Sequence, residues 1–189
     1  PEPVPPGDAD ALAQAYIDAF GDGVEYCDWP AEKVREDANT SIAGFFAGRH
    51  GAPLAASRLV RDSGDPSAPV IGAIFVIETG VAQALMDLLF VVPGRQRQGL
   101  GCAMAASALG ALRAMGFRTL ESRYLLANQT SRAWHYRMGF KDQPDFMSAR
   151  ALLAHARHRL ERHQIQGGSD APTLTVRSNN SKSSGLKSR

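Results

Sequence analysis

A turn-forming segment with two arginines and two closely spaced glycines offers the clearest chemistry in the sequence. Residues 91–101 (VVPGRQRQGLG) follow an apolar stretch and precede a run of small residues. Pro93 ends strand pairing because it has no N–H, and Gly99 and Gly101 let the backbone approach a bulky group or adopt a positive φ. Free N–H groups at a helix start attract anions, and the arginines add positive charge. The segment therefore predicts a phosphate or diphosphate site.

Two common phosphate-binding patterns do not fit this segment. The Gly-Lys-Ser/Thr ending of nucleotide-hydrolase loops is absent, and a single Gly-x-Gly does not make the dinucleotide pattern GxGxxG. The spacing is instead Gln/Arg-x-x-Gly-x-Gly, filled by Gln96, Gly99 and Gly101, with Pro93 three residues before Gln96. In these residues the segment resembles the acetyl-CoA signature of the GNAT superfamily of acyl-CoA-dependent N-acetyltransferases.

A second motif strengthens the resemblance. Residues 128–140 (NQTSRAWHYRMGF) are similar to the GNAT segment in which an Asn follows a strand and a short helix ends in an aromatic-rich turn closing with Gly-Phe. The matching positions are Asn128, Ser131, Gly139 and Phe140. The resemblance covers about residues 70–140, is weak over residues 8–61 and ends near residue 145. Two motifs in the expected order are improbable by chance.

The resemblance implies how acetyl-CoA binds. Its pantetheine arm is expected between two splayed parallel strands, here residues 84–92 and 118–126, with backbone groups of the first strand pairing to it. The amides that follow hold the diphosphate, and an Asn reaches the pantetheine or a water beside it. The implied cofactor-binding residues are Phe90, Val91, Val92, Gln96, Arg97, Gln98, Gly99, Leu100, Gly101, Cys102, Ala103 and Asn128. The alternative is a tight strand-to-helix turn that binds nothing.

The implied reaction is direct attack of an amine on the acetyl thioester, with a strand N–H, of Val91 or a neighbour, stabilising the oxyanion. The usual GNAT proton donor is a Tyr four residues before the Gly of Gly-Phe. That position holds His135 here, followed by Tyr136, and sequences resembling phosphinothricin acetyltransferases also carry His there. An imidazole can donate or accept a proton near neutral pH. The alternative is a half-exposed His135 without a role, with Tyr136 or water as the donor.

The proton acceptor for the amine is expected to be a carboxylate. Asp87 interrupts an apolar strand, and burying an unpaired acid there would be costly. Carboxylates near this place serve as base in several GNAT relatives, so the resemblance makes Asp87 the first candidate. An edge or bulge position, where Asp87 meets solvent or an Arg, is the alternative. Glu78 is the second candidate, and Glu121 is expected in a structural ion pair.

The cysteines and histidines suggest little further chemistry. Cys102 lies at a helix start, where thiolates are favoured, so an acyl-cysteine is conceivable. A small thiol packed beneath the turn is the more common arrangement, and Cys27 is expected to be packed in a loop. His155 and His158 share a predicted helix face with arginines, which indicates a solvated basic face and no metal site.

The elements that must position these residues alternate between helix and strand. Spacing of apolar residues predicts helices over residues 8–20, 29–49, 99–115, 130–138 and 149–164, and strands over residues 55–61, 70–78, 82–92 and 118–126. Gly80 separates two almost continuously apolar strands, which predicts a buried antiparallel hairpin. The fold class is α/β with a mixed, mostly antiparallel, splayed GNAT-like sheet flanked by helices.

Composition sets the broad class. The chain has 189 residues, 44% hydrophobic and 21% charged, with a formal net charge of +2, which predicts one globular domain over residues 1–165 and a basic low-complexity tail over residues 166–189. Two cysteines are too few for a disulfide scaffold. No apolar run approaches the roughly 20 residues that span a bilayer, and the acidic, proline-rich start is unlike a targeting peptide. A cytoplasmic location is expected.

Two partner classes and a second function remain open. The predicted acceptor is a small amine, and the ten acidic residues before residue 38 could attract a cation or form an ordinary surface. A non-catalytic acyl-CoA sensor would keep both motifs without the usual Tyr. The basic C-terminal part lacks interleaved aromatics, so nucleic acid is an improbable partner. We expect the first and last strands of the GNAT sheet to be missing, and an open edge would favour a homodimer.

Overall fold

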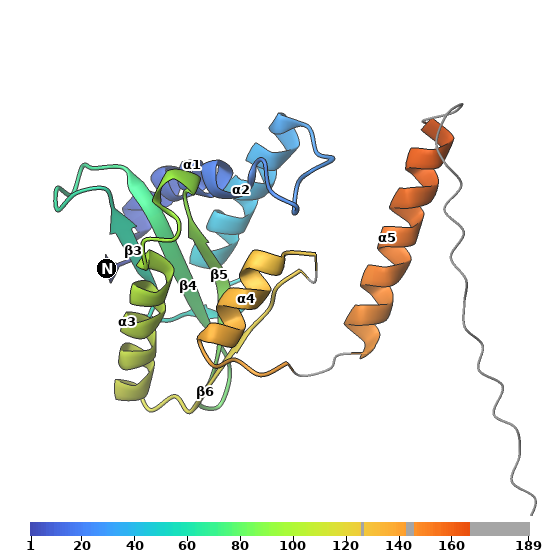
Figure 1. The fold of residues 1–189 in the computed structure, drawn as a ribbon. Helices are drawn as coiled ribbons and strands as arrows, with labels where there is room; N and C mark the ends of the chain where they lie inside the picture. The colour runs from blue at the N-terminus through green and yellow to red at the C-terminus, as the bar shows by residue number, and fades with distance from the viewer. Residues whose placement is uncertain (126, 143–145, 167–189) are drawn as a thin grey trace, which may run out of the picture. The chain divides into compact units, whose positions relative to one another are not determined.

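One open sheet with helices on both faces forms the body of the protein (Figure 1). The computed structural model describes residues 1–125, 127–142 and 146–166. Its strands are β1 (Glu2–Pro3), β2 (Ala52–Pro53), β3 (Arg58–Arg61), β4 (Val70–Gly80), β5 (Gln83–Val91) and β6 (Thr119–Ser122). Its helices are α1 (Ala9–Phe20), α2 (Ala31–Phe46), α3 (Leu100–Ala114), α4 (Gln129–Arg137) and α5 (Phe146–Gln166), with short 3-10 turns η1 (Pro6–Asp8) and η2 (Pro93–Arg95).

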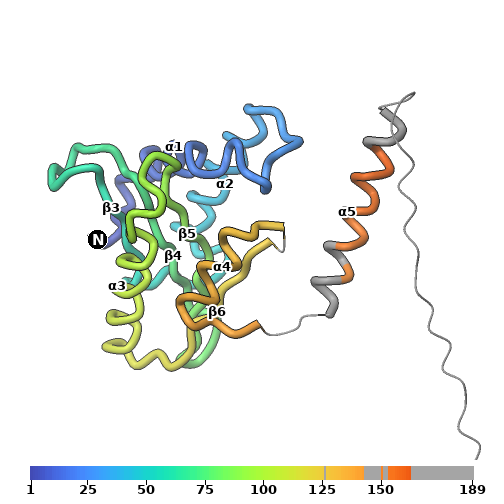
Figure 2. The backbone as a smooth tube through the Cα atoms, in the orientation of Figure 1, coloured from blue at the N-terminus to red at the C-terminus, as the bar shows by residue number. Residues whose placement is uncertain are grey.

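The strand order is β1-β3-β4-β5-β6, and β2 pairs with β4. All pairings are antiparallel except that of β5 with β6, which is parallel. The predicted hairpin of residues 70–92 is therefore confirmed, and the mixed, mostly antiparallel sheet is the fold class expected from the sequence. Figure 2 follows the chain from the hairpin through α3 into β6.

The sheet has a core on each face, which explains why β4 and β5 lack polar alternation. Ala73, Phe75 and Ile77 of β4 pack with α1 and α2, and Ile74 and Val76 pack on the other face with α3. The Phe75 ring stacks on Phe45 of α2 with centroids 4.2 Å apart. Burying such a side chain stabilises the fold by roughly 1.5–3 kcal/mol. A strand buried on both faces has to be apolar at every position.

Two edges of the sheet differ from the prediction. A first strand is present: β1 pairs with β3 through Glu2↔Leu59 and Pro3↔Arg58, and Arg61 forms ion pairs with Glu2 and Asp8. Two residues held by a salt bridge give no alternating pattern, so the sequence did not predict this strand. At the other edge, β6 is shorter than the predicted residues 118–126, and no strand follows it in the part of the chain that the structure describes.

The chain divides into two compact units, residues 1–141 and a second unit that begins at residue 142. The described part of the second unit is α5, whose residues 153–158 are all exposed, including Leu153 at 54%. The predicted domain of residues 1–165 stays a prediction, and the tail after Gln166 lies outside the described residues. None of the described helices is long and apolar enough to cross a membrane.

Candidate active site

The turn between β5 and α3 has the backbone geometry of an anion site. After η2, Arg97 has φ +60° and Gly99 has φ +83°, both in the left-handed region. Gly99 is the N-cap of α3, and the right-handed helix begins at Leu100. A left-handed residue followed by a right-handed one turns successive N–H groups toward a common concave side, an arrangement that binds anions.

Six consecutive amides in this turn have no hydrogen-bond acceptor. Gln96 N–H donates to Pro93 O at 3.2 Å, and Ala103 N–H donates to Gly99 O at 2.9 Å. Between them, the N–H groups of residues 97–102 donate to nothing in the part of the chain that the structure describes. The positive end of the α3 dipole points the same way. We call residues 97–102 the diphosphate cradle.

Side chains of the turn leave the diphosphate cradle open. Gln96 Nε2 donates to Val91 O at 3.0 Å, and Gln98 Nε2 donates to Gly94 O at 3.3 Å, so both amides fold back on the turn. Arg95 forms an ion pair with Asp62, and its charge is therefore balanced. Arg97 is exposed and has no ion-pair partner within the described ranges, which makes it the arginine available to an anion.

Gly101 serves a different purpose from Gly99. Its φ is not positive, and a Cβ at this position would lie 3.4 Å from Trp134 Nε1. The bulky group that the backbone approaches here is therefore the Trp134 indole of α4. Its Nε1–H is buried and has no acceptor among the described residues. Trp134 packs in the α3-side core with Met138.

β5 and β6 separate where pantetheine is expected. Their parallel pairing runs from Gln83↔Thr119 to Met86↔Ser122 and stops, although β5 continues to Val91. Val92 N–H donates to Ile71 O at 2.9 Å, so the antiparallel ladder turns the peptide groups of Phe90 toward β4 and those of Val91 away from it. Of the three predicted backbone contacts, Val91 is the one on the open edge, and the N–H of Val92 is already used.

Asp87 occupies a β-bulge at the point of separation. Leu88 pairs with Phe75 and Met86 pairs with Val76, so Asp87 has no partner residue on β4. Its side chain is 20% exposed, and its Oδ2 lies 3.3 Å from His50 Nδ1. The bulge that the sequence left open as an alternative is present, and the partner of the carboxylate is a histidine. Nothing near His50 in the sequence indicated this pairing.

His135 is buried, contrary to the half-exposed alternative. It is 5% exposed and lies on α4. Its Nδ1 is 2.7 Å from Ser131 O, and its Nε2 is 2.7 Å from Ser122 Oγ. A carbonyl oxygen only accepts, so Nδ1 carries a proton and the neutral ring accepts the Ser122 hydroxyl proton at Nε2. The ring of Tyr124 lies 4.8 Å from it. His135 is thus linked to the last β6 residue that pairs with β5.

Tyr136 lies on the outer side of α4. It is 46% exposed, and its hydroxyl oxygen accepts hydrogen bonds from Arg132 Nε and Nη2 at 3.3 and 3.2 Å. Adjacent helix positions face different directions. The structure therefore separates the two predicted proton donors, with His135 inside and Tyr136 outside.

Asn128 joins α4 to the loop between α1 and α2. Its Oδ1 accepts the Ser131 N–H at 2.8 Å as the N-cap of α4, and its Nδ2 donates to Glu25 Oε1 at 2.7 Å. The same loop is anchored by Tyr26, whose hydroxyl donates to Asp37 and lies 2.5 Å from the Tyr16 hydroxyl. Burial, followed by the hydrogen bond to Asp37, raises the pKa of Tyr26 far above its ordinary value. Burial is also the main cause that raises the pKa of Tyr16.

The remaining predicted residues contribute less. Cys102 is half-buried, but Cys27 is exposed where a packed residue was expected. Glu78 is exposed near the end of β4. Glu121 is also exposed and forms no ion pair within residues 1–125, 127–142 and 146–166, so the predicted structural pair is wrong. No group of three or more potential metal ligands occurs in the described part of the chain.

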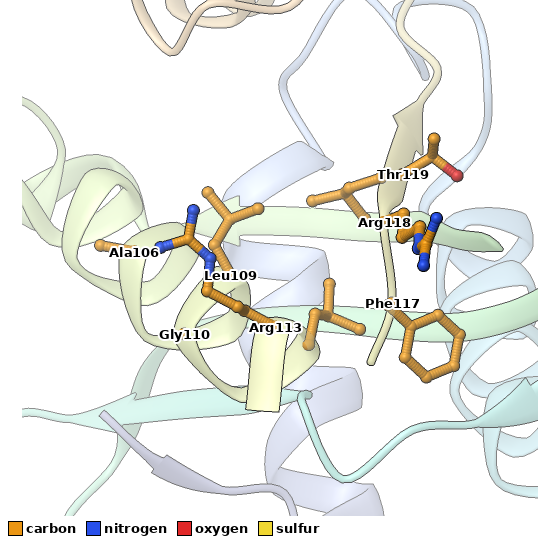
Figure 3. A pocket seen from close by; sticks show the side chains of 9 residues that line it. Ala106, Leu109, Gly110, Arg113, Phe117, Arg118 and Thr119 are labelled. Atoms are coloured by element: carbon orange, nitrogen blue, oxygen red, sulfur yellow. The ribbon is translucent and has the colours of Figure 1, made fainter. Parts of the chain in front are cut away.

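A surface pocket of about 480 Å³ lies away from these residues, between the C-terminal half of α3 and the start of β6 (Figure 3). Leu109 and Arg113 of α3 and Phe117 and Arg118 after it are among its lining side chains. None of the predicted site residues lines it.

Comparison with known proteins decides the family. The model of the acetyltransferase (GNAT) family matches residues 10–140. The chain belongs to the GNAT acetyltransferase family. This match confirms the resemblance seen in the two motifs, and it makes the protein an acyltransferase by family. None of the curated proteins compared matches the sequence significantly.

Solved structures share the GNAT fold with this chain. The ribosomal-protein-S18-alanine N-acetyltransferase from Escherichia coli is 19% identical, with a TM-score of 0.54 over 76% of this chain and 77% of that one. PaiA N-acetyltransferase from Thermoplasma acidophilum, solved with coenzyme A, is 16% identical, with a TM-score of 0.55 over 75% and 89%. A GNAT family acetyltransferase from Brucella melitensis, solved with acetyl-CoA, is 21% identical, with a TM-score of 0.53 over 75% and 81%.

Proposed function

We propose that this GNAT-family protein transfers an acetyl group from acetyl-CoA to the primary amine of a small-molecule or amino-acid-like acceptor, by direct attack in a ternary complex. The observation that carries the proposal is the diphosphate cradle beside the open edge of β5. β6 stops pairing with β5 after Met86 of β5, which leaves the rest of that edge of β5 without a neighbouring strand. Six N–H groups without acceptors follow just beyond this edge. This combination suits coenzyme A, in which a diphosphate is joined to a long, amide-containing pantetheine arm.

The residues present fit that cofactor. The amides of residues 97–102 would hold the diphosphate, and the exposed guanidinium of Arg97 would add a favourable charge. The N–H of Val91 would pair with a pantetheine carbonyl, because the Val91 carbonyl already accepts a hydrogen bond from Gln96, and Asn128 would contact the arm with the second Nδ2 proton. Bound acetyl-CoA supplies an activated acetyl thioester, which a neutral amine attacks with release of the free thiol.

The proton for the departing sulfur is assigned to His135 acting through Ser122. When His135 is protonated, its Nε2–H donates to Ser122 Oγ, which frees the hydroxyl proton for a group between β5 and β6. The Nδ1–H bond to Ser131 O holds the ring in place during this transfer. Tyr136 is the second candidate donor. Its side chain is exposed, but its hydroxyl oxygen already accepts hydrogen bonds from Arg132.

On the acceptor side, the base is assigned to the carboxylate of Asp87. It lies at the β5 bulge one residue beyond the last pairing with β6 and is 20% exposed. A positioned general base of this kind typically raises the reaction rate by about 10²- to 10⁴-fold. The acidic α1–α2 loop, which carries Glu25, would favour a cationic acceptor approaching from that side.

A homodimer and a cytoplasmic location are also part of the proposal. The outer edge of β6 carries no further strand in the described ranges. An unpaired sheet edge is a surface to which a second copy can add. Analytical ultracentrifugation at several protein concentrations would test the dimer.

The experiment that tests the function is acetyl-CoA turnover across a panel of amines, followed by the appearance of free thiol. We expect thiol release that depends on the amine and that falls at least tenfold in Asp87→Ala and in His135→Ala. Activity within a few-fold of wild type in both variants would refute the acid and base assignments. Saturable binding of acetyl-CoA without turnover of any amine would identify a non-catalytic acyl-CoA sensor instead.

A further inference from the structure

We infer that His50 is the group that accepts the proton of the attacking amine, and that Asp87 is the carboxylate that orients it. This inference rests on the proposed amine acetylation and changes which atom receives the proton. It is carried by the contact between His50 Nδ1 and Asp87 Oδ2, 3.3 Å apart, at the β5 bulge.

The bulge gives Asp87 a direction that a regular strand would not. As an extra residue between Met86 and Leu88, it is left out of the residue-to-residue pairing with β4. β6 has also ended its pairing at Met86. Asp87 is therefore the residue of β5 that has no partner on β4 and that directly follows the last residue paired with β6. Bulges re-aim side chains and are frequent beside active sites.

Two glycines with positive φ shape the loop that carries His50. Gly48 has φ +67° and Gly51 has φ +145°. A Cβ on Gly51 would lie 2.4 Å from Glu78 O of β4, so this position admits only glycine. The next residue, Ala52, begins β2 and pairs with Glu78. The histidine is thereby held at a fixed distance from the sheet that carries Asp87, although its own side chain is 55% exposed.

The pairing sets the tautomer of His50. An ionised carboxylate only accepts hydrogen bonds, so Nδ1 carries the proton in the contact with Asp87 and the lone pair lies on Nε2. Nε2 has no partner in residues 1–125, 127–142 and 146–166. Asp87 would also stabilise the imidazolium that forms when Nε2 takes a proton. Arg49, which is also charged, precedes His50 in the chain.

The resulting step is balanced in atoms and charge. The ammonium form of the acceptor gives a proton to His50 Nε2, and the neutral amine forms an N–C bond to the acetyl carbon as the C–S bond breaks. The sulfur leaves with the electron pair and takes its proton from His135 through Ser122, while the nitrogen loses its second proton to solvent as the amide forms. His50 returns its proton to solvent, which its 55% exposure allows.

A tautomer measurement tests the pair independently of activity. The ring signals of His50 are identified in long-range ¹H–¹⁵N spectra of the full chain by their absence from the spectra of His50→Gln. At a pH where the ring is neutral, these signals should show the Nδ1–H tautomer. In Asp87→Ala we expect the Nε2–H form that free imidazoles of histidine prefer. An Nε2–H tautomer in the wild type, or the same tautomer in Asp87→Ala, would overturn the inference.

Kinetics then test the role of His50 in proton transfer. For an alkylamine, His50→Gln should lower kcat/KM about 100-fold or more, while a weakly basic hydrazine, already neutral at the assay pH, should lose only a few-fold. His155→Gln, the same change at an exposed position of α5, should behave as wild type. Equal losses for both nucleophiles would reject His50 as the proton acceptor. Absence of turnover in the wild type with retained Nδ1–H tautomer would reject the proposed function and leave the pairing intact.

Discussion

Replacing Gly99 with aspartate and, separately, with asparagine would measure the electrostatics of the diphosphate cradle directly. Gly99 has φ +83°, and a Cβ there would meet nothing within 4 Å. Asn and Asp are the non-glycine residues that tolerate this left-handed conformation best. The two variants have nearly the same shape and the same backbone requirement. Their difference therefore isolates one negative charge placed at the N-cap of α3.

The size of the effect follows from Coulomb's law. Two unit charges about 4 Å apart interact by about 1 kcal/mol in water and by about 4 kcal/mol near a protein surface. A diphosphate carries two negative charges, so the carboxylate should weaken binding by at least about 2 kcal/mol, or roughly 30-fold in Kd. Because the site is open to solvent, the difference should shrink as the ionic strength rises.

Isothermal titration with coenzyme A at low and high salt would provide the two Kd values. We expect Gly99→Asp to bind at least about 30-fold more weakly than Gly99→Asn at low salt. Thermal unfolding should place the apo Gly99→Asp protein at least as high as Gly99→Asn, since their backbones are equally strained and the carboxylate lies at the positive end of the α3 dipole. Equal affinities of the two variants would mean that no phosphate lies at these amides, and the reasoning about residues 97–102 would be refuted.

Other changes have equally definite outcomes. Arg97→Asn, which keeps the left-handed backbone, should weaken coenzyme A binding by about fivefold, roughly 1 kcal/mol, in the same titration, while Arg95→Gln, whose charge is already balanced, should not. Ser122→Ala should lower turnover and, by leaving Nε2 of His135 without a partner, reduce the free energy of unfolding by about 1–3 kcal/mol; unchanged turnover would exclude the serine from proton transfer. The raised pKa of Tyr26 keeps its hydroxyl neutral in the folded state, while the unfolded chain ionises above about pH 10. The contribution of Tyr26 to the free energy of unfolding should therefore be constant below that pH and fall above it. In denaturant titrations at pH 9 to 11, Tyr26→Phe should make the fall of the unfolding free energy with pH shallower. The same slope in both proteins would contradict the burial of this hydroxyl.

The sequence predicts the centre of the fold well because both of its signals are local. The apolar runs of β4 and β5 indicate strands buried on both faces, and a proline followed by spaced glycines indicates a strand-to-helix turn. The left-handed φ of Gly99 is the conformation that the spaced glycines predict. The match of residues 10–140 to the GNAT family agrees with the two motifs.

The parts that were missed depend on contacts between distant residues. β1 exists as two residues paired with β3, and no periodic pattern can be read from two residues. The partner of Asp87 lies 37 positions away, in a loop whose placement requires Gly51 to approach β4. The sequence left the exposure of His135 open, because Ser122, the partner that makes its burial possible, lies on another element.

The most direct measurement is a ¹H–¹⁵N NMR titration of the full chain with coenzyme A. The largest shifts of backbone amides should fall on residues 97–102, with a second set at Val91, and all should saturate with one affinity that weakens with salt. Saturation with shifts confined to other parts of the chain, or no saturation at millimolar coenzyme A, would contradict the assignment of these amides to the diphosphate.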